Sequence, residues 1–230
     1  MCGRYALSTP IDVVAAVLGA DLDGASGAGL FGPRYNIAPT QQAPVVRVVD
    51  GRRVLGLLHW GLVPSWAKDR SIGNRMINAR SESVAEKPAF RAALRRRRCL
   101  VPADGFYEWQ RLGEGTRAPK QPWFIHAAGD GLLAMAGLWE RWKEPGGETL
   151  DSFTILTTEA NALMRPLHDR MPVLLAPEAY ERWLDPAQQE SADATALLVP
   201  APEKVLAAHK VSTHVNSPRN DDSACCAREG

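Results

Sequence analysis

The sequence predicts an α+β fold, a single domain with a curved, barrel-like, largely antiparallel β-sheet core flanked by short helices. Two observations predict this class. Short apolar runs separated by Gly, Pro and Asp follow one another from residue 44 onward, which is typical of the hairpins of an antiparallel sheet. Short stretches with helical spacing, several of them opened by proline, interrupt these runs. The 230 residues are 45% hydrophobic and 23% charged, which suffices for one sizeable core.

The N-terminal part of the chain predicts one amphipathic helix. Thr9 is a candidate N-cap, Pro10 takes the first helical position and Asp12 lies in the first turn. Apolar residues then recur at helical spacing until Gly19 ends the pattern. Residues 20–33 are rich in Gly and Ala without periodicity, so we expect a surface loop there.

The rest of the chain predicts seven strands and four further helices. The expected strands cover residues 44–49, 54–60, 99–102, 106–109, 123–127, 132–139 and 152–157. The expected helices cover residues 88–96, 160–167, 177–184 and 202–209. Turn residues at Asp50-Gly51, Asp104-Gly105 and Pro145-Gly146-Gly147 predict hairpins. The residues after Asn216 are polar and aperiodic, so we expect a domain over residues 1–216 and a flexible tail over 217–230.

The charge balance does not by itself indicate a nucleic-acid partner. The formal net charge is only +1, so any DNA site must be a local patch. The run Arg95-Arg96-Arg97-Arg98 suits either a solvated helix end or contacts with phosphate. No apolar window approaches the length of a membrane span, and the N-terminus lacks the pattern of a secretory signal. We therefore expect a cytoplasmic protein, associated with the nucleoid when bound to DNA, and a monomer by default.

Four cysteines offer little towards a metal site. Cys2, Cys99, Cys225 and Cys226 form no C-x-x-C pair, and no histidine cluster completes a ligand set. We therefore expect no metal and no cofactor. Cys99 lies in an apolar run and is expected in the core.

The strongest chemical signal is the second residue. A small side chain after Met1 favours removal of the initiator methionine, which would leave Cys2 with a free α-amine and a thiol. The amine titrates near about 7.7 to 8.0 and the thiol near about 8.5, so both nucleophiles are partly available at neutral pH. An aldehyde would react with the amine to an imine, and the thiol would then close a five-membered thiazolidine ring.

Six motifs in order extend this signal over most of the chain. They are Met1-Cys2-Gly3-Arg4-Tyr5, Arg34-Tyr35-Asn36-Ile37-Ala38-Pro39, Trp60-Gly61-Leu62-Val63-Pro64-Ser65-Trp66, Ile77-Asn78-Ala79-Arg80-Ser81-Glu82, Asp104-Gly105-Phe106-Tyr107-Glu108-Trp109 and His168-Asp169-Arg170-Met171-Pro172. Together they resemble the SOS response-associated peptidase (SRAP) family, whose members shield abasic sites as DNA-protein cross-links. The resemblance runs from Cys2 to about Asn216 and implies a curved, largely antiparallel sheet.

The resemblance implies four catalytic residues. Cys2 would be the cross-linking nucleophile, and Asn78 would orient the Cys2 terminus and the opened sugar. Glu108 would move protons, and His168 would assist opening of the sugar ring and stabilise the intermediate.

The residue chemistry agrees with these roles and leaves simpler ones open. Strand alternation puts Glu108 on one face with Phe106, where apolar surroundings make a carboxyl hold its proton more tightly. Glu108 could instead point to solvent, His168 could be a favourable charge at a helix end, and Asn78 could cap a turn.

The DNA-binding residues are expected around this pocket. Gly3 leaves room beside the reacting carbon, Asn36 and Pro39 would shape the groove, and Arg4, Arg80 and Arg170 would neutralise flanking phosphates. Trp66 and Trp109 would stack on unpaired bases, although Ala67 replaces a second aromatic residue found in some relatives. Trp60, Trp123 and Trp183 are expected in the core.

The implied function is therefore that of a sensor and shield of abasic sites in single-stranded DNA, with self-processing and a weak strand-cleaving (lyase) activity as side reactions. Three rivals remain. A mature N-terminal cysteine also occurs in amidohydrolases, but their Asn-Gly and Arg-Gly motifs are missing at suitable positions. Cys2 and His168 could form a peptidase acting on other proteins, and simple binding of single strands needs no covalent step.

Overall fold

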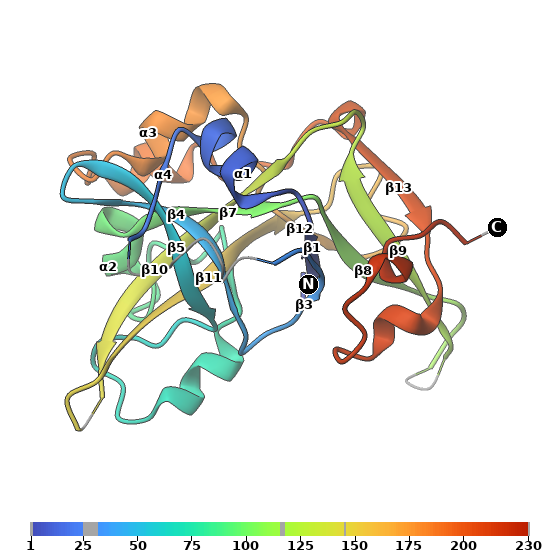
Figure 1. The fold of residues 1–230 in the computed structure, drawn as a ribbon, viewed down its shortest axis with the longest axis horizontal. Coiled ribbons are helices and arrows are strands. Elements are labelled where there is room, and N and C mark those ends of the chain that lie inside the picture. The colour runs from blue at the N-terminus through green and yellow to red at the C-terminus, as the bar shows by residue number, and fades with distance from the viewer. Residues whose placement is uncertain (1, 25–31, 116–117, 145, 230) are drawn as a thin grey trace.

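A barrel of five strands forms the centre of the computed structural model, which describes residues 2–24, 32–115, 118–144 and 146–229 (Figure 1). Its strands are β4 (Gln42–Val49), β5 (Arg52–Trp60), β7 (Arg98–Ala103), β10 (Leu133–Lys143) and β11 (Thr149–Glu159). The pairs β5–β4, β4–β7, β7–β10 and β10–β11 are antiparallel, and the parallel pair β11–β5 closes the ring. Closure removes the free edges that an open sheet would leave.

A second, wholly antiparallel sheet lies beside the barrel (Figure 1). Its order is β13 (Leu206–Lys210), β9 (Lys120–Ala127), β8 (Gly105–Arg111), β1 (Tyr5–Leu7) and β3 (Arg34–Ile37). Tyr5 and Phe106 belong to the main core with the barrel, whereas Ala6 and Tyr107 belong to a smaller cluster with the C-terminal residues. The two faces of β1 and β8 therefore pack against different parts of the chain.

Short elements complete the fold. β2 (Asp21–Leu22) runs parallel to β5, β6 (Asn78–Arg80) runs parallel to β11, and β12 (Arg170–Pro172) runs antiparallel to β11. The helices are α1 (Ile11–Leu18), α2 (Arg91–Arg96), α3 (Tyr180–Leu184) and α4 (Ser191–Thr195), and the 3-10 turns are η2 (Arg70–Arg75), η3 (Pro177–Ala179), η4 (Glu203–Val205), η5 (Thr213–Asn216) and η6 (Ser223–Cys225). The predicted class, a barrel-like and largely antiparallel sheet with short helices, is confirmed. No helix in the described ranges is long and apolar enough to cross a membrane.

An aromatic group links the barrel to the second sheet. Trp60 is fully buried, its indole lies 6.2 Å from the ring of Phe153, and Tyr5 meets it edge-on at 5.2 Å. The expected burial of Trp60, Trp183 and Cys99 is confirmed, while Trp123 is only half-buried. Because Tyr5 is on β1, this contact holds the N-terminal segment against the barrel.

All seven predicted strands exist, and one predicted hairpin does not. Asp50 and Gly51 both have positive φ, 49° and 76°, as a tight hairpin between β4 and β5 requires. Asp104-Gly105 instead carries the chain from the barrel into the second sheet, so the hairpin predicted there is wrong. A turn signal reports a change of direction but not which strands pair afterwards.

Two of the five predicted helices are wrong. In the first, residues 162–167 form successive turns, and in the second, residues 202–209 contain η4 followed by β13. The helices expected over 88–96 and 177–184 exist as α2 and as η3 with α3. Pro202 does precede a tight turn, η4. Both stretches are too short for their hydrophobic periodicity to distinguish a helix from a strand or a turn.

The first helix begins one residue later than predicted, at Ile11 instead of Pro10. Pro10 precedes α1, and Thr9 instead donates its hydroxyl to Asp104 at 2.5 Å, as Ser8 does at 2.7 Å. Gly19 ends the helix with φ 60°, as predicted. In the expected loop, Asp21–Leu22 form β2, and residues 25–31 lie outside the described residues.

The residues after Asn216 differ from the expected flexible tail. Asp221 accepts hydrogen bonds from the backbone N–H groups of Tyr35 at 2.5 Å and Asn36 at 2.9 Å, and Cys225 is fully buried. The segment therefore covers the outer face of the second sheet. Isolated polar side chains make these contacts, so the segment shows no regular spacing of apolar residues from which its order could be predicted. The predicted domain boundary itself stays a prediction.

The arginine run divides between structure and surface. Arg98 is buried and donates to the backbone carbonyls of Leu94, Arg95, Trp183, Asp185 and Gln188. Arg97 pairs with Glu140 at 2.7 Å, and Arg95 and Arg96 are exposed. Arg98 thus links α2 to α3, and the four arginines do not form one continuous basic patch on the surface.

Replacing Gly105 by alanine should destabilise the crossing between the sheets. A Cβ there would lie 2.4 Å from Cζ of Phe124 and 2.5 Å from the carbonyl oxygen of Ile125. We expect Gly105→Ala to lower the free energy of unfolding by about 3 kcal/mol, the upper end of the usual range for overpacking. Urea denaturation measures this. Gly129→Ala is the control, because its Cβ would have no neighbour within 4 Å; equal losses in both variants would contradict the explanation.

Candidate functional site

The pairing of β1 with β8 positions the N-terminal residues. Tyr5 lies opposite Phe106, and the backbone N–H of Tyr107 donates to the carbonyl of Arg4 at 3.0 Å. Continuing this antiparallel register by two residues puts Gly3 opposite Glu108. Cys2 is fully buried and belongs to the main core, on the same face of β8 as Phe106.

Asn78 approaches Cys2 from the other side. β6 runs parallel to β11 with Asn78 beside Ile155, and Nδ2 of Asn78 donates to the carbonyl oxygen of Cys2 at 2.9 Å. Oδ1 of Asn78 is buried and has no hydrogen-bond partner among the described residues. The amide therefore holds the backbone of Cys2 and keeps an acceptor directed into the site.

Burial and charge act together on the Cys2 thiol. Burial, and after it the negative charge of Glu108, raises the pKa of the Cys2 thiol. Glu108 itself is 3% exposed. Burial and the nearby Cys2 thiol likewise raise the pKa of Tyr5. In this state the thiol is protonated at neutral pH, so it can supply a proton as well as a nucleophile.

His168 lies at the end of the turns after β11. Its backbone N–H donates to the carbonyl of Met164 at 2.9 Å. Its Nδ1 is 2.9 Å from the backbone nitrogen of Arg170 and 2.7 Å from Oδ1 of Asp169. One ring nitrogen cannot accept from the amide and donate to the carboxylate at once, so the ring protonation state decides which neighbour it bonds. Gln110, on the strand of Glu108, bonds this segment through the carbonyl of Pro166 at 3.4 Å.

Two of the predicted phosphate-binding arginines differ in availability. Arg80 is exposed at the end of β6. Arg170 forms a two-pronged ion pair with Glu82 at 2.6 and 2.9 Å and also donates to the carbonyl of Thr157 at 2.6 Å. That contact lowers the pKa of Glu82, so the pair is ionised at neutral pH. A phosphate would meet Arg80 directly and would compete with Glu82 for Arg170.

The third arginine is held by the C-terminal segment. Arg4 donates to Oδ1 of Asn36 at 2.8 Å and to the carbonyls of Val215 at 2.9 Å and Asn216 at 3.2 Å. Its guanidinium lies 5.9 Å from the ring of Trp109, which in turn donates to Oδ1 of Asn216 at 2.7 Å. Three of the five N–H groups of Arg4 are thus occupied within the protein.

Asn36 is bonded to the C-terminal segment. It is fully buried, and its Nδ2 faces the carbonyls of Val215, Ser217 and Asn220 at 3.1, 3.0 and 2.7 Å. Asp221, which the sequence did not single out, ties the same strand down, and its other carboxylate oxygen pairs with Nε of Arg34. The polar run Asn220-Asp221-Asp222 is the sequence feature that could have drawn attention to Asp221. Nothing in that run indicates that its partners lie in β3.

The remaining predicted DNA-binding residues lie near the surface. Trp109 and Gly3 are half-buried, as is Pro39, which precedes a turn at Thr40 with φ 72°. Trp66 is 59% exposed on the loop before η2. The structure thus brings together Cys2, Asn78 and Glu108, with Gly3 alongside, and places Trp66 on a separate loop.

The residues around Cys2 do not form a group of three metal ligands within the described part of the chain. One such group exists there, formed by His214, Asp222 and Cys225. Cys225 belongs to the smaller cluster and Cys2 to the main core, so β1 and β8 separate the two groups.

Comparison with known proteins gives a consistent result. A family model described as SOS response associated peptidase (SRAP) matches residues 1–218. The chain is 42% identical to the abasic site processing protein YoaM of Bacillus subtilis, with 97% of this chain and 96% of that protein covered. It is 34% identical to the abasic site processing protein HMCES of Xenopus tropicalis, with 99% of this chain and 78% of that protein covered.

Solved structures show the same fold. A protein from Bacteroides thetaiotaomicron superimposes with a TM-score of 0.88 at 28% identity, covering 99% of this chain and 100% of that one. A phage-related protein from Bordetella bronchiseptica gives a TM-score of 0.73 at 34% identity, covering 91% of this chain and 94% of that one.

Removing the Asn36 side chain should release the C-terminal segment. Asn36→Ala leaves buried carbonyls and one side of Arg4 without partners, so we expect a loss of about 3 kcal/mol in stability. Limited trypsin digestion should then cleave after the exposed Arg219 faster than in the unaltered protein. The exposed Asn74→Ala is the control. Unchanged cleavage at Arg219 in Asn36→Ala would show that other contacts hold the segment.

Proposed function

The chain belongs to the SOS response-associated peptidase (SRAP) family, and from that membership we propose that it processes abasic sites in DNA through a covalent bond to Cys2. The relatives YoaM and HMCES are named for abasic site processing. The substrate we propose is the ring-opened aldehyde of an abasic site in single-stranded DNA. The product is a DNA-protein cross-link that shields the lesion.

The placement of Cys2 carries this proposal. Its carbonyl is held by Asn78 at 2.9 Å, its thiol lies within the electrostatic influence of Glu108, and the side chain is buried. A surface cysteine with an accidental position would have none of these contacts. The arrangement supports a preorganised nucleophile with an acid-base group beside it.

The proposed chemistry needs both nucleophiles of Cys2. Removal of Met1 turns the Cys2 nitrogen into an α-amine. The amine adds to the aldehyde carbon, and the carbonyl oxygen leaves as water to give an imine. The sulfur then adds to the imine carbon, and the thiol proton ends on the nitrogen. One water is lost overall, and the thiazolidine forms without a metal or a cofactor.

The neighbouring residues fit distinct roles in these steps. Glu108 would take a proton from the amine and give one to the departing oxygen, which a buried carboxyl beside the nucleophile can do. Oδ1 of Asn78 would accept from the amine or from a sugar hydroxyl. His168 would move protons during opening of the sugar. Its Nδ1 has a donor nearby in the backbone N–H of Arg170 and an acceptor in the carboxylate of Asp169, so it has a partner both with and without a proton.

The DNA strand would pass over the N-terminal residues. Gly3 keeps side-chain bulk away from the reacting carbon opposite Glu108. Arg80 would bind a flanking phosphate, and Arg4 and Arg170 would add their charge while remaining partly paired inside the protein.

Trp109 and Trp66 would stack on unpaired bases, the first near the site and the second farther along the strand. Pro39 would border the groove, and Asn36 would act indirectly by holding Arg4.

Two side reactions follow from the same intermediate and nucleophile. Loss of the sugar proton next to the imine carbon would expel the 3′ phosphate, which is a lyase reaction. The family name reflects a peptidase-like site, which here would act on the chain's own Met1–Cys2 bond rather than on other proteins.

Cys2→Ala should abolish the covalent product, because it removes the thiol that closes the ring. The measurement is intact mass after incubation with an oligonucleotide that carries one abasic site. The unaltered protein should lose Met1 and gain a DNA adduct that survives denaturation. Cys2→Ala and Cys2→Ser both keep the α-amine once Met1 is removed, so a reductant should still trap an imine in either variant. A mature Cys2 that forms no adduct would favour an amidohydrolase or a peptidase, and an adduct retained in Cys2→Ala would refute the proposed nucleophile.

Glu108→Gln and His168→Ala should slow cross-linking without preventing DNA binding. General acid-base catalysis contributes roughly 100- to 10,000-fold, and we expect losses within that range for Glu108→Gln. Single-turnover rates measured at saturating DNA report the chemical steps. The exposed Glu86→Gln and the half-buried His59→Ala, neither of which is assigned a role in the reaction, are matched controls. Rates equal to those of the controls would contradict the assigned roles.

A further inference from the structure

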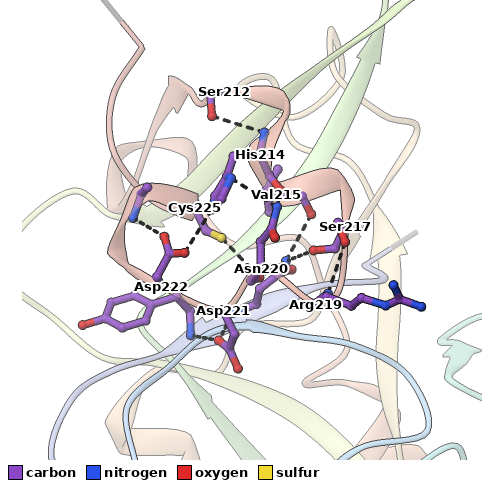
Figure 2. A network of polar contacts seen from close by, with 12 residues as sticks. Ser212, His214, Val215, Ser217, Arg219, Asn220, Asp221, Asp222 and Cys225 are labelled. Atoms are coloured by element: carbon purple, nitrogen blue, oxygen red, sulfur yellow. Dashed lines mark hydrogen bonds and ion pairs between the residues drawn. The ribbon is translucent and has the colours of Figure 1, made fainter.

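Three side chains of the C-terminal segment gather around one point (Figure 2). His214 lies in η5, and Cys225 ends η6. Asp222 precedes η6, and its Oδ1 accepts a hydrogen bond from the backbone N–H of Ala224 at 3.0 Å. One ligand atom from each residue lies within 4.8 Å of the other two. Nε2 of His214 and Oδ2 of Asp222 are 3.0 Å apart.

We infer that His214, Asp222 and Cys225 bind a zinc ion. A nitrogen, an oxygen and a sulfur ligand suit Zn²⁺, whose bonds to them are about 2.0 to 2.3 Å. Ligand atoms of a tetrahedral zinc ion are therefore roughly 3 to 4 Å apart, so the three side chains need only small movements. A water molecule would complete the four ligands.

The charges of the group favour a divalent cation. Asp222 is anionic at neutral pH, since its hydrogen bond from His214 lowers the pKa of the carboxyl. The Cys225 thiol is protonated without metal, since burial raises its pKa. On binding, the thiol loses its proton to solvent and sulfur bonds the zinc. The two anionic ligands then neutralise the ion.

The neighbouring Asn220 determines the proton position on the imidazole. Its Nδ2 donates to the carbonyl of His214 at 2.7 Å and lies 3.1 Å from Nδ1, so without metal the ring proton is on Nε2 and faces Asp222. Zinc takes the lone pair of Nε2, and the proton moves to Nδ1. The Asn220 amide then turns its oxygen towards Nδ1, which supplies the outer acceptor that zinc-bound histidines commonly have.

The position of this site links it to the residues near Cys2. Val215 and Asn216 directly follow His214, and their carbonyls hold Arg4. Oδ1 of Asn216 accepts from Trp109. A bound zinc ion would fix the segment that supports these two side chains on the outer face of the second sheet.

The sequence alone does not indicate this site. The ligands are spaced as His-x7-Asp-x2-Cys, which contains one cysteine and one histidine rather than pairs. The segment also lacks the periodicity that predicts an ordered element. The fold brings the ligands together only because residues 213–225 curl back over Asn36.

Titration with Zn²⁺ and a competing chromogenic chelator tests the inference. The protein is the full chain with Cys2→Ala, because Cys2 and His168 offer another thiol and imidazole. We expect one zinc ion per chain and a higher thermal midpoint with zinc. Adding His214→Gln, Asp222→Asn or Cys225→Ser should weaken binding by more than the roughly 10- to 100-fold typical for loss of an outer partner. Titration with Co²⁺ should give a thiolate charge-transfer band that disappears in Cys225→Ser.

Cys226→Ser is the matched control, because this adjacent thiol contacts Tyr107 and is not part of the cluster. It should keep both the affinity and the cobalt band. Asp222 is exposed, so Asp222→Asn tests the site even if Cys225→Ser fails to fold. Absence of zinc binding, unchanged affinity in the ligand variants, or an equal loss in Cys226→Ser would overturn the inference. None of these outcomes depends on whether the protein cross-links DNA.

Discussion

The antiparallel pairing of β1 with β8 is the contact on which the rest of the molecule depends. β1 has only three residues, yet it joins the second sheet, presents Tyr5 to Trp60 of the barrel and sets the position of Cys2. Glu108 comes opposite Gly3 through the same register, and Asn78 reaches Cys2 from the barrel side. Because side chains alternate along a strand, a slip of one residue would turn Tyr5 away from the core and Arg4 into it.

The two faces of this strand pair serve different purposes. The face towards the barrel carries the buried side chains of Cys2 and Glu108, and charges in such a low-dielectric interior act strongly on each other. The other face carries Arg4, which bonds Asn36 and the C-terminal segment. The groups proposed to react thus lie in the interior, and Arg4 and Asn36 lie between the sheet and the end of the chain. The proposed zinc site belongs to the second face.

The sequence predicted those parts whose signal is local. The long strands carry runs of apolar residues, and the turn at Asp50-Gly51 needs positive φ, so both could be recognised. The helix predicted over residues 202–209 is wrong, because a stretch as short as the five residues of β13 can form either a strand or a helical turn. The sequence motifs predicted three residues of the candidate site that lie close together in the structure, namely Cys2, Asn78 and Glu108. The role of Asp221 could not be foreseen, because its partners lie 185 to 187 residues back in the chain.

In the proposed reaction, both the amine and the thiol of Cys2 bond to the same carbon of the opened sugar. Peptide-level mass spectrometry of the cross-linked protein, after nuclease digestion and treatment with amine- and thiol-modifying reagents, tests it most directly. We expect the sugar remnant on the peptide that begins with Cys2, and we expect neither the amine nor the thiol of Cys2 to take up reagent. A remnant on a lysine, or a Cys2 whose thiol is still modified, would contradict it.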